Sequence, residues 1–471
     1  MFKSHQQFKM KSLKKTRSKK LIIAGSFAND INKLKREFWL NSVEARTYFE
    51  EIHVLVNGRV NVDIGSFKQA YFPGWLWHTK FNWSRFFCGA IYFLILLLQS
   101  PKFIYEVVAL EYKTLPFSLN WHPVTALKLS KTFITCVCGL GLVFRTFIRL
   151  DLSAQDTVVV WSEHVTGMRL LKRKVRRSGA RLILSEYGEL PGTMFICDRG
   201  MFHESWPLLF KEKFSALPVS IDEVGEMKKH IHNIVNECIS SKVGQYDANS
   251  NLEAINLPKG KPVIYVNGVQ AHASGLLPRS SKFSHEYSPY FGSNYEMLKY
   301  FANLAKKNDW IIIFKDHPNT CNYFPGQEIC DGEWGEHVKI LGNIDIYKIF
   351  TLADLTVSLG SKTVYLSLLN QVPVYLMGPY SINSDDLSCG LYTGGMSEEA
   401  IISAVEAAQN HGVDVEGLTV YLTRMMKYFY YSMDDDSNSL FGRGRQQFWK
   451  DFLDYMKGGR SFISAKVKVM E

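Results

Sequence analysis

The stretch WIIIFKDHPN, residues 310–319, decides the fold. The segment Trp310–Lys315, which is apolar up to Phe314, is typical of a strand that is buried on both faces of a sheet. Polar residues follow at once, and Pro318 keeps His317 from continuing into a helix. Such a strand belongs in a parallel sheet that helices cover on both sides. The stretch therefore predicts an α/β domain whose polar residues gather where a strand ends.

The neighbouring segments alternate between strand and helix patterns in the same way. The expected strands are Lys261–Asn267, Val338–Leu341, Leu355–Leu359 and Val372–Met377. The expected helices are Tyr295–Lys307, Ile346–Ala353, Lys362–Leu369 and 398–410. This alternation predicts consecutive βαβ units.

The first half of the chain shows a second series of the same kind. Strands are expected at Leu21–Gly25, Glu51–Val56, Thr157–Ser162 and Ala180–Ser185, and helices at Asp30–Phe49, about 84–148 and Thr166–Ser178. The fold class expected is α/β, with two tandem doubly wound Rossmann-like domains and a crevice between them.

The polar run at residues 241–260 reads as a linker between these domains. The expected organisation is a basic disordered tail at 1–20, a first domain at 21–240, a second domain at 261–415 and a helical segment at 416–471 that crosses back to the first domain.

Charge is concentrated at the start of the chain. The net charge of the 471 residues is +10, and residues 1–20 carry eight Lys or Arg and no acid, which leaves +2 for the rest. The nearly balanced body predicts no nucleic-acid partner. The tail is expected either to contact an anionic membrane surface or to remain a solvated extension.

The cysteine spacing excludes a zinc ribbon and a C-x-x-C redox motif. The eight cysteines show no C-x-x-C spacing, which indicates free thiols in a reducing compartment. The apolar run Phe86–Leu98 is shorter than the roughly 20 residues of a routine membrane span. Buried or interfacial helices are therefore expected there, although the Trp-rich stretch Tyr71–Phe87 suits a bilayer surface as well as a core.

Two carboxylates follow the strand of residues 181–184. Glu186 and Glu189 lie in the stretch SEYGELPGT, and a carboxylate at a strand end can accept a proton from a hydroxyl group. The alternative is a plain turn with solvated acids, since Gly188, Pro191 and Gly192 suit a turn.

Two later stretches suit a phosphate group. In the first, Lys315, His317 and Pro318 end a strand, and the histidine can donate to a phosphate or to a leaving oxygen. In the second, a strand passes into a helix with small residues whose hydroxyl and N–H groups can hold an anion: Ser358, Gly360, Ser361 and Thr363. Ordinary N-capping by Ser361 is the alternative.

These stretches, in this order, resemble bacterial sialyltransferases and Kdo transferases, which are GT-B glycosyltransferases that use CMP-activated sugars. The similarity to capsule and lipopolysaccharide synthesis proteins covers Glu186–Thr193, Val263–Pro278, Trp310–Asn319 and Ala353–Gly378. The resemblance implies that Glu186 is the catalytic acid or base, that His317 binds CMP, and that Ser361 and Thr363 hold the donor phosphate. It also implies a reaction without a metal or another cofactor.

One position departs from the resemblance. His272 stands where β-Kdo transferases have an acidic residue before Ala-Ser, so His272 is a third catalytic candidate. The departure leaves inverting transfer with Glu186 as base at least as well supported as a retaining mechanism.

The function expected is transfer of a sugar, with CMP-Kdo or a related CMP-sugar favoured, to a glycan or lipid-linked acceptor of a surface polysaccharide. The expected location is the cytoplasm, with peripheral binding to the inner face of the plasma membrane. The alternatives are a CDP-glycerol or CDP-ribitol phosphotransferase, a UDP-sugar GT-B enzyme and a noncatalytic capsule-assembly scaffold.

Overall fold

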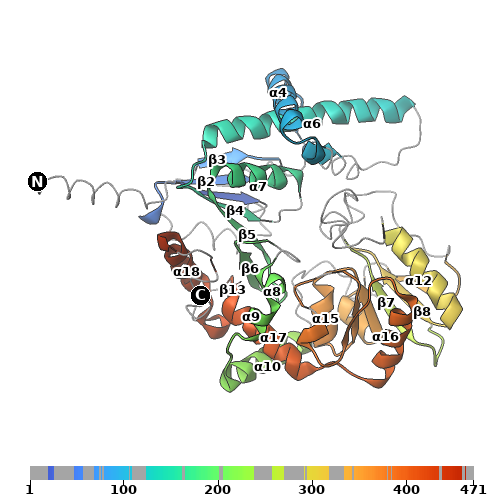
Figure 1. Ribbon diagram of the computed structural model, residues 1–471. Helices are drawn as coiled ribbons and strands as arrows, with labels where there is room; N and C mark the ends of the chain where they lie inside the picture. Colours follow the sequence, from blue (N-terminus) through green and yellow to red (C-terminus); the bar gives the residue numbers. More distant parts are fainter. Residues whose placement is uncertain are drawn as a thin grey trace, which may run out of the picture.

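A computed structural model shows two β-sheets, each with helices packed around it (Figure 1). The described residues are 20–25, 47–56, 68–73, 76, 79–104, 107–108, 123–161, 165–200, 205–237, 257–269, 291, 294–317, 334–341, 344–378, 380–382, 384–433, 438–458 and 462. The predicted α/β class with two doubly wound domains is confirmed.

The first sheet has the order β13-β6-β5-β4-β1-β2-β3. Its strands are β1 (Lys20–Gly25), β2 (Glu51–Val56), β3 (Lys68–Tyr71), β4 (Thr157–Trp161), β5 (Arg181–Tyr187), β6 (Thr193–Cys197) and β13 (Tyr430–Ser432). The strands from β3 to β5 pair in parallel, whereas β6 and β13 are antiparallel. The sequence did not predict β6, because Thr193–Cys197 follows its partner strand through a tight turn instead of a crossover helix.

The second sheet has the order β12-β11-β10-β7-β8-β9. Its strands are β7 (Val263–Asn267), β8 (Ile311–Lys315), β9 (Val338–Leu341), β10 (Leu355–Ser358), β11 (Val374–Leu376) and β12 (Leu391–Thr393), and all of their pairings are parallel. In chain order this is the 3-2-1-4-5-6 arrangement of a Rossmann sheet.

Helices cover both faces of each sheet. The helices around the first sheet are α4 (Trp83–Gln99), α6 (Pro123–Leu150), α7 (Thr166–Ser178), α8 (Trp206–Leu209), α9 (Lys211–Ser215), α10 (Ile221–Asn236) and α18 (Arg445–Gly458). Those around the second are α12 (Asn294–Asn308), α14 (Ile346–Phe350), α15 (Thr363–Leu369) and α16 (Glu398–Asn410). The helix α17 (Val415–Tyr428) follows α16, and the short 3₁₀ turns η5 and η7 span Ser384–Asp386 and Leu440–Gly442.

Side-chain alternation along β1 builds two separate cores. Ile22 and Ala24 face the cluster that contains α4, α6 and α7, whereas Leu21 and Ile23 face α18. This is the period of two that a strand imposes on its side chains. Figure 1 shows α18 on one side of the first sheet and α6 and α7 on the other.

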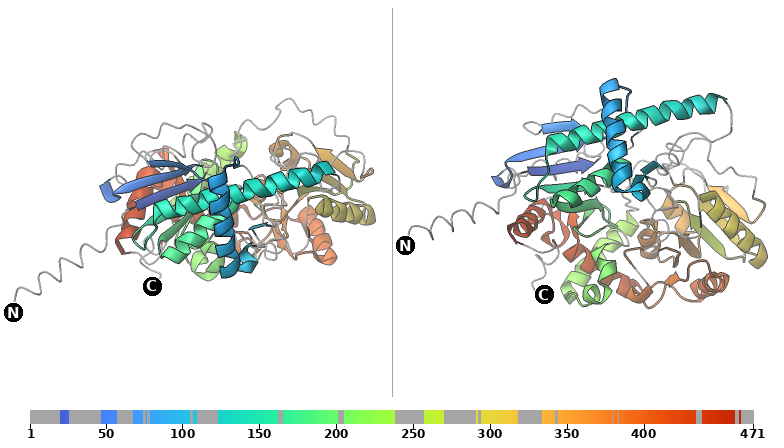
Figure 2. Two further views of the ribbon diagram at one scale, coloured as in Figure 1. Left: turned by 90° about the horizontal axis from the view of Figure 1, so that it is seen from above. Right: turned by 45° about the horizontal axis from the view of Figure 1, so that its top comes forward.

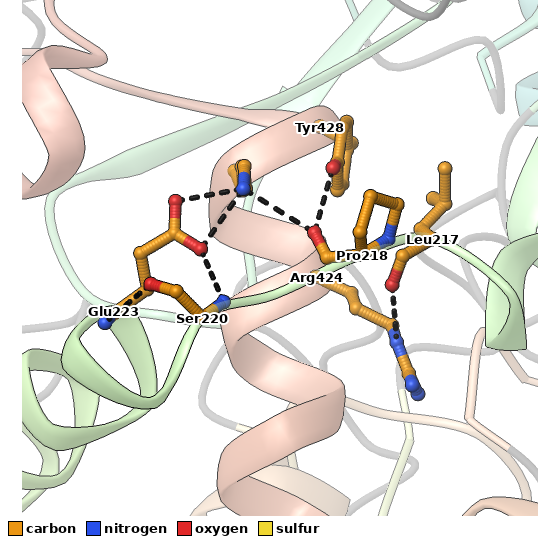
Figure 3. Close-up of polar contacts among 7 residues, drawn as sticks. Leu217, Pro218, Ser220, Glu223, Arg424 and Tyr428 are labelled. Atoms are coloured by element: carbon orange, nitrogen blue, oxygen red, sulfur yellow. Dashed lines mark hydrogen bonds and ion pairs between the residues drawn. The ribbon is translucent and has the colours of Figure 1, made fainter. Parts of the chain in front are cut away.

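The chain leaves the second sheet through α17 and returns to the first. Lys427 on α17 forms an ion pair of 2.7 Å with Glu223 on α10, and the Tyr428 hydroxyl donates to the Pro218 carbonyl at 2.8 Å (Figure 3). Glu223 also closes a capping box with Ser220 at the start of α10. These contacts place Tyr430 beside Phe195, where β13 begins to pair with β6. The segment expected to be helical after residue 416 is thus interrupted by a strand.

In the described part of the long helical region expected at about 84–148, α4 and α6 are separate helices, and residues 101–104 and 107–108 are also helical. In the described residues, one helix segment, Ser130–Leu150 of α6, is long and apolar enough to cross a membrane, and 50% of its window is buried inside the protein. A core helix passes the same test of length and composition. Residues 1–19, residues 30–46 of the helix expected at Asp30–Phe49, and most of the linker expected at 241–260 lie outside the described residues.

Candidate functional site

Three polar side chains line up at the carboxyl end of the second sheet. Asn267 ends β7 and pairs in register with Lys315 at the end of β8. Ser358 ends β10, which pairs with the other edge of β7. The strand order reverses between β7 and β10, and open α/β sheets bind their ligands at this switch point. We call Lys315, Asn267 and Ser358, with Thr363 above them, the strand-end row.

Hydrogen bonds join three members of the strand-end row, Asn267, Ser358 and Thr363. The Asn267 side chain donates to Ser358 Oγ at 3.5 Å and accepts from Thr363 Oγ1 at 3.4 Å. Its Oδ1 also accepts from the Tyr265 hydroxyl at 3.1 Å. Lys315, Asn267, Ser358 and Thr363 are all buried. Buried polar groups of this kind present fixed donors at low cost in reorganisation.

The loop before α15 completes this arrangement. Gly360 has a φ of 138°, which favours glycine, and its N–H donates to Ser358 Oγ at 3.3 Å. Ser361 Oγ accepts from the Thr363 N–H at 3.3 Å. Lys362 occupies the N-cap position of α15, and its side chain makes no capping hydrogen bond. The bond from the Thr363 N–H to Ser361 Oγ is the kind of contact that the alternative, N-capping by Ser361, predicts.

Lys315 carries the positive charge of the strand-end row. It continues the face of Ile311 and Ile313, so it points away from Phe314, as strand alternation predicted. Burial lowers the pKa of Lys315, and the Asp345 and Asp316 carboxylates oppose that shift.

His317 follows β8, which pairs with one edge of β7, whereas Ser358 ends β10, which pairs with the other edge. Asp316 Oδ1 accepts from the His317 N–H and from Asn294 Nδ2, both at 2.7 Å. The half-buried His317 therefore follows a pinned turn, but β7 separates its strand from β10. Pro318 and His272 lie outside the described residues.

The two carboxylates of the first domain occupy a β-hairpin. β5 continues to Tyr187, and Glu186 pairs with Phe195 of β6. The Gly188 N–H donates to the Thr193 carbonyl at 2.9 Å and closes the turn. The expectation that the strand ends at Leu184 was wrong, since Glu186 stands within the strand rather than beyond it.

The hairpin turn contacts the second domain. Ser381 Oγ donates to Glu189 Oε1 at 3.2 Å, and the Lys362 ammonium lies 5.0 Å from the centre of the Tyr187 ring. Glu189 Oε2 is buried and finds no hydrogen-bond partner among the described residues. We call Glu186, Tyr187, Glu189, Lys362 and Ser381 the interdomain cluster.

Burial dominates the electrostatics of the interdomain cluster. It raises the pKa of Glu189 from 4.5 to about 7, although Lys362 and Ser381 act in the opposite direction. Burial also lowers the pKa of Lys362, against the effect of Glu186 and Glu189. A carboxyl group whose pKa lies near neutrality is a common feature of functional sites.

A chain of buried hydroxyl groups leads from Glu189 into the interface. The Tyr365 hydroxyl lies 2.8 Å from Ser381 Oγ and 3.0 Å from the Tyr421 hydroxyl. Because Ser381 donates to Glu189, it must accept from Tyr365, which in turn accepts from Tyr421. The hydrogen bonds therefore all point towards the carboxylate and stabilise its ionised form.

Sequence reasoning missed several residues of these arrangements, among them Asn267, Lys362 and Ser381. Asn267 ends a predicted strand just before Gly268, so the strand-end rule could have found it. Lys362 begins the helix expected at Lys362–Leu369, but no local pattern indicated that it would face carboxylates of the first domain. Ser381 had no detectable signal, because its role comes from a contact between distant segments. In the described part of the chain, no group of three or more His, Cys, Asp or Glu residues could hold a metal ion.

Comparisons with known proteins find distantly similar solved structures but no matching sequence. The sequence matches no family model and no curated protein. Among solved structures, it is similar to the β-Kdo 2,7-transferase of Thermosulfurimonas dismutans KpsC, with 16% identity, a TM-score of 0.35, and coverage of 60% of this chain and 88% of that one. A glycosyltransferase from Rickettsia africae has 11% identity and a TM-score of 0.32, with coverage of 93% and 98%. A UDP-GlcNAc 2-epimerase from Methanocaldococcus jannaschii has 13% identity and a TM-score of 0.28, with coverage of 87% and 99%.

Proposed function

We propose that this protein is a GT-B glycosyltransferase that transfers a sugar from a nucleotide donor to a hydroxyl group of a glycan or lipid-linked acceptor. The observation that carries the proposal is the position of Lys362. It lies between Ser358 and Thr363 of the strand-end row and also faces Glu186 and Glu189 of the first domain. Lys362 would thus lie between the phosphate of the donor and the carboxylate that accepts the proton.

The strand-end row is the proposed donor-phosphate site. Lys315 supplies positive charge there, and the Ser358 hydroxyl, which accepts from Asn267 and Gly360, has a proton to donate to a phosphate oxygen. The Thr363 hydroxyl would exchange its bond to Asn267 for one to phosphate. CMP-activated acidic sugars, CMP-Kdo among them, are the favoured donors because of the sequence resemblance. In that case the bond between the anomeric carbon and the phosphate oxygen breaks, and CMP leaves with the electron pair.

Glu186 is the proposed proton acceptor. Its side chain is half-buried and remains reachable, whereas the Oε2 atom of Glu189 is enclosed. Glu186 would take the proton of the acceptor hydroxyl while the acceptor oxygen bonds to the anomeric carbon. Glu189 would act as a positioning residue that holds Lys362 between the two domains.

A donor screen on the purified full chain tests the proposal. CMP-Kdo, CMP-sialic acid, CDP-glycerol and UDP-sugars are compared for release of nucleotide, and CMP binding is measured by calorimetry. We expect release from a CMP-sugar, and Ser358→Ala should weaken CMP binding about tenfold, as loss of one hydrogen bond to a charged group does. Ser178→Ala on α7 is the control. Release of nucleotide from CDP-glycerol alone would favour the phosphotransferase alternative, and nucleotide binding without turnover would favour a scaffold.

A further inference from the structure

The outward face of α4 carries an exposed apolar stripe. Five side chains recur along it at intervals of three or four residues, which places them on one side of a helix. They are Trp83 (65% exposed), Phe87 (61%), Ile91 (54%), Leu94 (56%) and Leu98 (86%). We call them the α4 stripe. Exposed apolar residues scattered singly are normal, but a continuous stripe of this kind marks an interaction surface.

The opposite side of α4 is already occupied. Gly89, Tyr92 and Leu96 are its buried residues, and at about 100° per residue they lie across the helix axis from the α4 stripe. The helix crosses α6 so closely that a Cβ added to Gly89 would lie 1.8 Å from the Val137 carbonyl oxygen (Figure 2). The described residues of α6 therefore pack against the side of α4 that carries Gly89, and they leave the α4 stripe uncovered.

The composition of α4 indicates what does cover the stripe. From Phe86 to Leu98 the helix is apolar around its whole circumference, which is typical of a helix inside a large core or in contact with lipid. Aromatic rings gather at its start, where Phe81 lies 5.1 Å from Trp83 and Trp83 lies 6.0 Å from Phe87, measured between ring centres. Trp residues at the edge of an apolar surface suit the boundary between lipid and water.

Charge around α4 has one sign. Neither α4 nor α6 contains an acidic residue. Arg145 donates to Ser84 near the start of α4, and Arg177 donates to Gln99 at its end. Arg173 lies 4.4 Å from the centre of the Phe103 ring, just beyond that end. An anionic bilayer surface attracts such a ring of basic residues, whereas a second copy of the chain would bring the same positive charge.

We propose that the α4 stripe docks into the interfacial layer of a bilayer that contains anionic phospholipid. The helix lies in the plane of the membrane rather than across it. With 17 residues α4 is about 25 Å long, less than a hydrocarbon core requires. The segment of α6 that is long enough to cross is held by the first domain, because Leu140, Val143 and Phe147 belong to its core. An exposed apolar face with basic residues around it binds the interfacial layer through its buried apolar area and through attraction to anionic lipid.

Vesicle binding of the full chain tests this proposal without reference to enzyme activity. Co-sedimentation is measured with phosphatidylglycerol–phosphatidylcholine vesicles and with phosphatidylcholine vesicles alone. We expect binding to the anionic vesicles, weaker binding to the neutral ones, and a loss of at least tenfold in affinity for the double variant Leu94→Gln with Leu98→Gln. Glutamine is a good helix former, so the exposed positions keep their helix.

Ile221→Gln is the matched control. Ile221 is 90% exposed at the start of α10, so this variant removes an equally exposed apolar side chain away from α4. It should bind vesicles like the unchanged protein. Equal vesicle affinity of the α4 double variant and the unchanged protein would overturn the proposal. It would also be overturned if the double variant kept its vesicle binding but changed from a dimer to a monomer, because a second copy of the chain would then cover the α4 stripe.

Discussion

At the scale of single residues, Glu189 couples the contact between the domains to pH. Its pKa is raised from 4.5 to about 7, so the folded chain holds a proton that the unfolded chain releases. Stability therefore falls as pH rises between these two values. Glu189→Gln cannot lose that proton. Relative to the unchanged protein, the free energy of unfolding of the variant should therefore rise by about 2–3 kcal/mol as the pH goes from about 4 to about 8.

Urea unfolding across this pH range measures the effect. The exposed Glu212→Gln on α9 is the control, and its stability should follow the unchanged protein. Parallel stability curves for Glu189→Gln and the unchanged protein would show that burial does not govern this carboxyl group.

Glu186 is expected to dominate the chemical step. Glu186→Gln keeps the shape of the side chain but removes the proton acceptor, so turnover should fall about 10²–10⁴-fold with little change in donor affinity. Glu189→Gln should reduce turnover much less. Single-turnover assays with a donor found by the screen compare the two variants, and a reversed order of effects would assign the role to Glu189.

The sequence predicted the strand-end residues better than it predicted the hairpin. Lys315 and Ser358 end strands whose apolar runs are visible in the chain, so their places follow from local pattern. Glu189 depends on Ser381 and Lys362, which lie far along the sequence, and no local pattern reports such a contact. The strand β6 was not predicted for a related reason, because its pairing depends on the turn after β5 and on the distant strand β13.

At the scale of elements, α4 and α6 depend on two glycines. A Cβ on Gly141 would lie 1.8 Å from the Arg85 carbonyl oxygen, so the two backbones touch where the helices cross. Gly141→Ala should therefore cost about 1–3 kcal/mol of stability, as overpacking does. Urea unfolding is the measurement.

Gly225 on α10 gives the matched control, since a Cβ there meets nothing within 4 Å. Gly225→Ala should stabilise the protein by up to about 1 kcal/mol, because alanine has the better helix propensity. If Gly141→Ala were equally stabilising, the close crossing of α4 and α6 would be wrong.

At the scale of the whole molecule, packing joins the two sheets. Tyr365 and Leu368 of α15 belong to the same apolar cluster as Phe214 of α9 and Tyr421 of α17. The chain end contributes to the other face of the first sheet, where Trp449 is 1% exposed. Each domain therefore contains side chains that a distant part of the chain supplies, and one should not unfold without disturbing the other.

Trp449→Ala tests this coupling. The cavity should cost about 3–5 kcal/mol, whereas Trp83→Ala, at a side chain that is 65% exposed, should change stability by less than about 0.5 kcal/mol. Hydrogen exchange followed by mass spectrometry reports β1 in the first sheet and β7 in the second. Because the shared cluster spans both sheets, protection should fall in β7 as well as in β1, although Trp449 contacts only the first sheet's core. Faster exchange confined to β1 would mean that the second sheet stays folded by itself and that the cluster does not transmit the loss.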